Sequence, residues 1–213
     1  MQLGVDEAGK GPVLGSMFAA AVRADPTDLP AGIDDSKHLS AARREELASQ
    51  LRADGNISIG VAEIPTERID DPETDMNTLT VAAQAEALAA VAEDGDTGVL
   101  DAGDTDADRF GRRVTDRVAA DIELVAEHKA DETHALVGAA SIVAKVARDS
   151  HIAGVATDYE RQIGSGYPSD PTTREFLRSY VAEFGDLPAC ARESWQTSRD
   201  VLAAAAQTGL DEF

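Results

Sequence analysis

Short apolar runs recur along this chain, and several of them are followed by a stretch with helical periodicity. The runs at residues 97–100 and 122–125 are each followed by such a stretch. Residues 2–5 and 12–22 read as strands joined through a glycine-containing segment, and residues 56–64 read as a third strand because their apolar side chains alternate. This alternation is typical of an α/β sheet, so we predict a mixed central β-sheet flanked by helices.

Capping residues and apolar spacing place the helices. Ser40 can cap a helix over residues 41–53, in which Leu47 and Leu51 lie four residues apart on one face. Asp170 and Pro171 have the chemistry of a helix start. The other helices are predicted at about 75–92, 133–159, 171–185 and 195–206.

No internal repeat or low-complexity linker divides the sequence. We therefore predict a single domain over residues 1–213. Its parts are an α/β core over about 1–160, a C-terminal helical extension over about 161–206, and a tail at 207–213.

The composition is strongly acidic. The chain has 40 Asp and Glu against 19 Lys and Arg, for a net charge of −21, yet 43% of its residues are hydrophobic, which is enough for a core. Dense carboxylates with few lysines indicate a halophilic protein, since molar salt screens charge repulsion within about 3 Å. Cys190 is the only cysteine, so a disulfide framework is excluded, and the N-terminus has no signal-peptide pattern. We expect a cytoplasmic monomer.

Four carboxylates stand where strands end. Asp6 and Glu7 follow the first apolar run, Asp101 closes the run at 97–100, and Asp131 lies shortly after the next. Strand ends are where ligands bind in α/β sheets, and carboxylates without a His or Cys cluster suit Mg²⁺ or Mn²⁺. Two such ions can activate water in phosphodiester hydrolysis. The alternative is that Asp101 and Asp131 only complement the next helix's N-terminus.

The distribution of lysine favours the site. All four lysines fall within residues 6–12, 35–40 or 128–149, about a sixth of the chain. Ser141, Lys145 and Asp149 are spaced four apart, so they form one polar stripe on an otherwise apolar helix. The stripe is predicted to face the site, although an ordinary Lys145–Asp149 surface pair is the alternative.

Five motifs in order resemble ribonuclease HII of archaeal type. They are DEAGKGP at 6–12, DDSKHLS at 34–40, EHKAD at 127–131, SIVAKVARD at 141–149 and GSGYPSDP at 164–171. The resemblance implies a ribonuclease H-like fold and an endonuclease that cuts the RNA strand of RNA/DNA hybrids. It also implies cleavage at single ribonucleotides in duplex DNA, leaving 3′-hydroxyl and 5′-phosphate ends, in ribonucleotide removal and RNA primer processing.

The resemblance also assigns roles to residues. It implies that Asp6, Glu7, Asp101 and Asp131 are the catalytic and metal-binding carboxylates of a two-metal site holding Mn²⁺ or Mg²⁺. The glycine segment would read the ribose 2′-hydroxyl through its backbone, which glycine allows to approach closely. Lys10 stands where the family commonly has arginine. The substrate-binding residues implied are Gly9, Lys10, Gly11, Ser36, Lys37, Lys129, Ser141, Lys145 and Tyr167.

The C-terminal tail suggests a partner. Gln207, Leu210 and Phe213 have a spacing that one helical turn would align, which resembles a motif that binds the sliding clamp PCNA, without its usual second aromatic residue. A frayed helix end is the alternative. For the whole chain, the alternatives are another two-metal nuclease of the same fold acting on DNA, and a non-catalytic protein that binds hybrids or the clamp.

Overall fold

A computed structural model of the protein describes residues 1–33 and 39–210, without the side chains of 208–210. The chain divides into two compact units. Unit 1 comprises Met1–Lys10, Met17–Glu63 and Asp75–Arg148, and unit 2 comprises Gly11–Ser16, Ile64–Thr74 and Asp149–Phe213.

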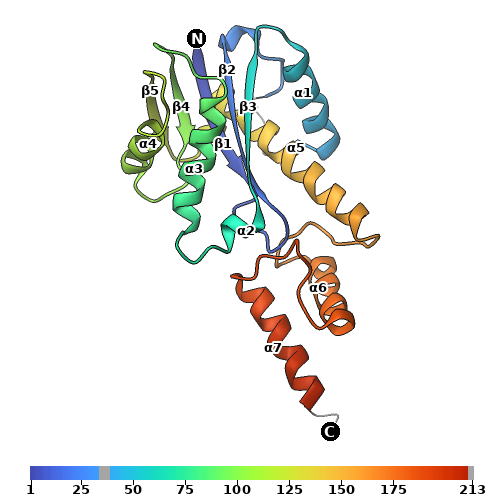
Figure 1. Ribbon diagram of the computed structural model, residues 1–213. Coiled ribbons are helices and arrows are strands. Elements are labelled where there is room, and N and C mark those ends of the chain that lie inside the picture. The colour runs from blue at the N-terminus through green and yellow to red at the C-terminus, as the bar shows by residue number, and fades with distance from the viewer. Residues whose placement is uncertain (34–38, 211–213) are drawn as a thin grey trace. The chain divides into compact units, whose positions relative to one another are not determined.

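A five-stranded sheet in the order β3-β2-β1-β4-β5 forms the centre of unit 1 (Figure 1). The strands are β1 (Gln2–Ala8), β2 (Met17–Ala24), β3 (Ser58–Ile64), β4 (Thr97–Asp101) and β5 (Glu123–Glu127). β1 pairs antiparallel with β2 and parallel with β4, and β4 pairs parallel with β5. The sheet is therefore mixed, and the predicted fold class is confirmed.

The helices begin at the capping residues that the sequence contains. They are α1 (Ala41–Ala53), α2 (Thr66–Ile69), α3 (Met76–Ala89), α4 (Ala107–Thr115), α5 (Ala135–Asp158), α6 (Pro171–Phe184) and α7 (Gln196–Leu210), with short 3-10 turns at Pro26–Asp28 and Ala130–Glu132. Ser40 accepts a hydrogen bond from the Arg43 N–H at the start of α1, and Asp75 caps α3 in the same way. Gly185, with a φ of 79°, ends α6.

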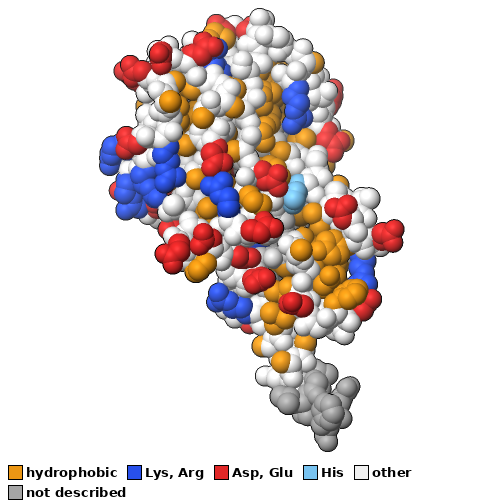
Figure 2. Space-filling view, in the orientation of Figure 1, with side chains coloured by type: hydrophobic (Ala, Val, Ile, Leu, Met, Phe, Trp, Pro, Cys, Tyr) orange, Lys and Arg blue, Asp and Glu red, His pale blue; other side chains and the backbone are white. Residues whose placement is uncertain are grey.

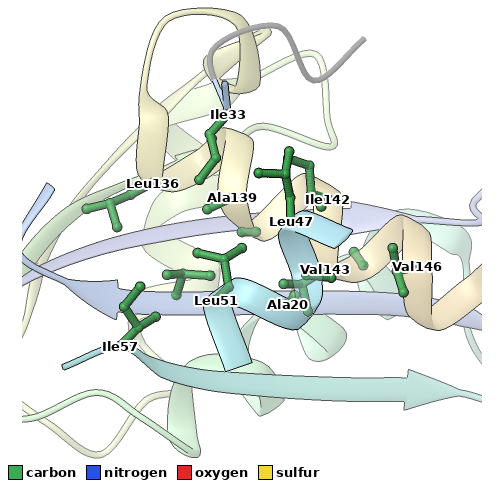
Figure 3. Close-up of a cluster of buried hydrophobic side chains, with 14 of the residues drawn as sticks. Ala20, Ile33, Leu47, Leu51, Ile57, Leu136, Ala139, Ile142, Val143 and Val146 are labelled. Carbon is green, nitrogen blue, oxygen red and sulfur yellow. The ribbon is translucent and has the colours of Figure 1, made fainter. Parts of the chain in front are cut away.

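The core of unit 1 lies between one face of the sheet and helices α1 and α5 (Figure 3). Leu47 and Leu51 of α1 pack against Ile142 and Val143 of α5 within one buried cluster. A Cβ atom at Gly4 would lie 2.2 Å from the Leu136 carbonyl carbon, so only glycine lets α5 approach β1 this closely. This approach brings the next buried turns of α5 over the end of β1.

The predicted strand at residues 12–22 is wrong in its first part. β2 begins only at Met17, and residues 11–16 belong to unit 2. The N–H groups of Val13 and Leu14 donate to the Gly166 carbonyl, at 2.8 and 3.2 Å, and the Gly15 N–H donates to the Cys190 carbonyl at 2.7 Å. Loop carbonyls thus satisfy these backbone groups in place of a β ladder.

Unit 2 has a core of its own. Val13, Leu14, Ile163, Phe176 and Leu177 are buried together in it. No helix among the described residues is long and apolar enough to cross a membrane.

Candidate active site

Asp6 and Glu7 are consecutive residues of β1 and point to opposite faces of the sheet. The strand runs on through Ala8, so the alternation of side chains is not interrupted between them. Asp6 lies on the face of α5, close to Ser141, while Glu7 accepts a hydrogen bond from Gln84 of α3 on the other face.

The Asp6 carboxyl is buried, with 6% of the residue exposed. Its pKa is raised well above the ordinary value, first by burial and then by the charge of Glu7, with a smaller contribution from Asp101. The fully buried Ser141 hydroxyl acts in the opposite direction. Ser141 thus lies near Asp6, and its role in substrate binding stays a prediction.

The pKa of Glu7 is raised to about 7, chiefly by burial. The Gln84 amide and the Lys10 charge lower it, while Asp101 raises it. Gln84 Nε2 donates to Glu7 Oε2 at 2.7 Å and to the Asp101 carbonyl at 3.0 Å. Glu7 is therefore connected to the end of β4 through one buried amide.

A hydrogen bond from the backbone next to Asp131 connects this residue's turn to the Asp101 carboxylate. The Ala130 N–H donates to Asp101 Oδ1 at 2.7 Å, so the 3-10 turn containing Asp131 is held against the end of β4. Asp131 is 9% exposed. Lys129, just before it, has a φ of 59°, a strained conformation for a residue with a side chain. The structure thus brings the end of β4 and this turn together.

The donor set of this cluster suits a hard divalent cation. Its carboxylates are oxygen donors, and burial and mutual repulsion make their charged forms costly unless a cation or a proton compensates. In the conformation seen, no group of three or more His, Cys, Asp or Glu side chains among the described residues is spaced to hold a metal. The chemistry of the donors therefore fits a metal, while the opposed side chains of Asp6 and Glu7 do not enclose one.

Lys10 has a role inside the protein that the sequence did not reveal. Its ammonium donates to Asn77 Oδ1 at 3.1 Å and to the Gly103 carbonyl. A Cβ at Gly103 would lie 3.1 Å from Glu7 Oε1, so this loop packs directly on the carboxylate. The Lys10 side chain thus ties the end of β1 to the loop that covers Glu7.

In unit 2, Gly11 lies beside Tyr167. A Cβ at Gly11 would be 3.8 Å from the Tyr167 ring, and the Gly11 carbonyl accepts a hydrogen bond from Trp195 Nε1 at 3.3 Å. The Tyr167 side chain is 40% exposed. Two residues that the resemblance linked to the substrate are therefore neighbours, and one of their supports, Trp195, was not predicted.

Gly9 has a φ of 90°, which supports a turn requiring glycine. Lys145 is half-buried on α5, and Gln207 is exposed near the end of α7. Ser36, Lys37 and Phe213, and the side chain of Leu210, lie outside the described residues.

Sequence reasoning did not find Gln84. It is one polar residue in the mostly apolar α3, and neither its spacing nor a motif distinguishes it. Only the packing of α3 against β1 reveals its contact with Glu7.

The chain is similar to known ribonucleases over nearly its whole length. A family model for ribonuclease HII matches residues 3–198. Ribonuclease HII of Halobacterium salinarum, a halophile, is 65% identical over 212 residues, which cover 100% of this chain and 99% of that protein.

Two solved structures have the same fold. The ribonuclease H2 from Pyrococcus horikoshii OT3 has a TM-score of 0.88 and 34% identity, covering 97% of this chain and 99% of that one. The PCNA:RNase HII complex from Archaeoglobus fulgidus contains a chain with a TM-score of 0.83 and 36% identity, covering 94% of this chain and 96% of that one.

Proposed function

This chain belongs to the ribonuclease HII family and is an enzyme of the ribonuclease H type, and from that premise we propose that it hydrolyses the RNA strand of RNA/DNA hybrids. The observation that carries the proposal is the carboxylate cluster at the ends of β1 and β4, where the buried Asp6 and the half-buried Glu7 and Asp101 interact electrostatically. Such a cluster destabilises the fold, and a requirement for metal ligands in a nuclease would explain why the protein has it.

We propose that Asp6, Glu7, Asp101 and Asp131 hold divalent metal, Mg²⁺ or Mn²⁺, in a two-metal site. When bound, such ions supply a nucleophilic water and stabilise the charge on the leaving oxygen of the phosphodiester. The protein's own part is to position the carboxylates at the ends of β1 and β4 and in the turn after β5. Ser141 lies close to Asp6, and the Ala130 N–H fixes Asp101 beside the turn of Asp131.

Recognition of RNA is assigned to the glycine segment and Tyr167. We propose that backbone groups of Gly9, Lys10 and Gly11 bind the ribose 2′-hydroxyl, and that the exposed Tyr167 ring packs on the sugar of the following deoxynucleotide. The proximity of Gly11 to the Tyr167 ring within unit 2 supports this pairing. The phosphate contacts are proposed for Ser36, Lys37, Lys129 and Lys145.

One substrate series tests the proposal. Duplex DNA with a single ribonucleotide is incubated with Mg²⁺ or Mn²⁺, and the matched substrate has a 2′-deoxynucleotide at the same position. We expect cleavage of the first substrate only, with 3′-hydroxyl and 5′-phosphate products. Cleavage of both would indicate a DNA nuclease of the same fold, and binding without cleavage of any hybrid would indicate a non-catalytic protein.

We also propose that the C-terminus binds the sliding clamp. Helix α7 extends to Leu210, so the backbone from Gln207 to Leu210 is helical, as alignment of the motif requires. The Archaeoglobus fulgidus relative was solved in a PCNA complex. Deleting residues 207–213 should abolish pull-down by PCNA and leave cleavage intact, whereas undiminished pull-down would reject the motif. The cytoplasmic location, the monomeric state and one functional domain over residues 1–213 stay predictions.

A further inference from the structure

Gln84 is a fully buried polar side chain that touches the carboxylate cluster. It lies on α3 with 0% exposure, and its single Nε2 donates both to Glu7 Oε2 and to the Asp101 carbonyl. The two N–H groups of the amide thus donate to β1 and β4, the two strands that carry the proposed metal ligands Glu7 and Asp101. The geometry is within the normal range, at 2.7 and 3.0 Å.

The other end of the same amide is not satisfied. Gln84 Oε1 is buried and has no hydrogen-bond partner in the part of the chain that the structure describes. A buried acceptor without a partner destabilises a fold, and most native proteins avoid it. An apolar side chain would pack in α3 without this cost, so packing alone does not account for a glutamine here.

We propose that Gln84 is a positioning residue that holds the Glu7 carboxylate in place for metal and fixes its distance from the end of β4. Groups that bond to a metal's ligands orient those ligands, and their loss typically weakens metal affinity or activity about 10–100-fold. An amide suits this task because it donates to a carboxylate at any pH without adding a charge. The inference rests on the proposed metal-holding role of Glu7.

The test is Gln84→Met, which keeps the length of the side chain and removes both donors. Mn²⁺ binding is measured by calorimetry without substrate, and cleavage is measured across a Mn²⁺ series. We expect metal affinity to fall about tenfold or more and the activation curve to move to higher Mn²⁺. Wild-type affinity together with a wild-type activation curve would overturn the proposal.

Thr80→Val is the matched control. Thr80 lies one turn earlier on α3, is fully buried, and its hydroxyl donates to the Met76 carbonyl at 2.6 Å within the same helix. This variant loses a buried hydrogen bond without removing a group bonded to Glu7. It should lower thermal stability and keep the Mn²⁺ affinity of the wild type. An equal loss of Mn²⁺ affinity in both variants would show that damage to α3, and not the Gln84 amide, is responsible.

Glu7→Gln separates this inference from the proposed function. If Glu7→Gln does not weaken Mn²⁺ binding, the proposed metal site itself fails. If it weakens binding while Gln84→Met does not, only the role of Gln84 fails. Should Gln84→Met not fold, the wild-type protein still gives an answer by NMR. Saturating Mg²⁺ should shift the Gln84 side-chain amide resonances and leave those of the distant Gln50 unchanged, and unshifted Gln84 resonances would reject the proposal.

Discussion

At the scale of single residues, the site contains a carboxylate, Asp6, whose charged form is disfavoured by its surroundings. Asp6 is buried with a pKa raised well above its ordinary value, because burial and the nearby Glu7 both oppose its ionisation. An ionised Asp6 at neutral pH therefore costs stability in the absence of a cation. Replacing the Asp6 carboxylate should therefore lower activity and raise the stability of the metal-free protein.

We predict this for Asp6→Asn, which replaces the carboxylate with an uncharged group of the same shape. Cleavage should be abolished and hybrid binding largely kept. The melting temperature of the metal-free protein at neutral pH should rise, and added Mn²⁺ should stabilise the variant less than the wild type. Scanning calorimetry with and without Mn²⁺ measures both effects, and a metal-free variant less stable than the wild type would contradict the prediction.

Lys10 gives a second prediction at this scale. Its ammonium is bonded to Asn77 and the Gly103 carbonyl, and its charge lowers the pKa of Glu7. We expect Lys10→Met to lower kcat about tenfold or more with little change in KM, because the side chain acts on the carboxylate site and not on substrate. Lys10→Arg, which keeps a cation, should cost less. A rise in KM alone would point to a phosphate contact instead.

The sequence was sufficient to nominate the four carboxylates but not their supports. Position at strand ends selects Asp6, Glu7, Asp101 and Asp131 among many acidic residues, because that rule depends only on the order of strands. Gln84, Trp195 and the bonds of the Lys10 ammonium depend on which helix face or loop meets β1 in space. No local pattern carries that information.

At the scale of secondary-structure elements, helix starts were the most predictable feature. The α1 bounds agree with the sequence because Ser40 caps that helix, and α6 begins at Pro171 after Asp170. The strand predicted at residues 12–22 was wrong at its start because the hydrogen-bond partners of residues 13–15 are distant loops. Apolar content alone does not reveal such partners.

Asp170 joins the start of α6 to the loop that carries Tyr167. It accepts hydrogen bonds from the N–H groups of Ser165 at 2.6 Å and Thr172 at 2.9 Å, and these bonds lower its pKa to about 2. A carboxyl whose pKa is lower in the folded state stabilises the fold above its unfolded pKa, near 3.8, and loses that contribution as the pH falls towards 2.

We therefore predict that Asp170→Ala destabilises unit 2 near pH 6 and that the difference from wild type shrinks between about pH 4 and pH 2. Trp195, the only tryptophan, lies in unit 2 and reports its urea unfolding by fluorescence. Asp170→Asn is the control, since it keeps a capping acceptor and removes the charge. Its stability near pH 6 should lie between those of the wild type and Asp170→Ala. If the difference in stability between the wild type and Asp170→Ala does not change with pH, the charge of Asp170 does not contribute to the cap.

At the scale of the whole molecule, the net charge of −21 is at odds with a nucleic-acid substrate. Acidic side chains are spread over the visible face in Figure 2, and basic ones gather mainly over α4. Several arginines are used within the protein, as in the pairs of Arg23 with Asp96 and Glu93 at 2.6 Å. Release of counterions from phosphates, the usual source of affinity, is also weak in molar salt.

Recognition must then rely on contacts that salt screens little. The proposed contacts of this kind are metal ligation by buried carboxylates, backbone hydrogen bonds to the 2′-hydroxyl, and packing of Tyr167 on a sugar. We predict that cleavage of a single-ribonucleotide duplex persists from low salt to molar KCl, with folding checked by circular dichroism at each step. A nuclease with six to ten phosphate contacts would lose about 10³–10⁵ in affinity between 50 and 200 mM salt. A steep loss of activity with the fold intact would therefore mean that cations on the surface, and not the buried site, bind the substrate.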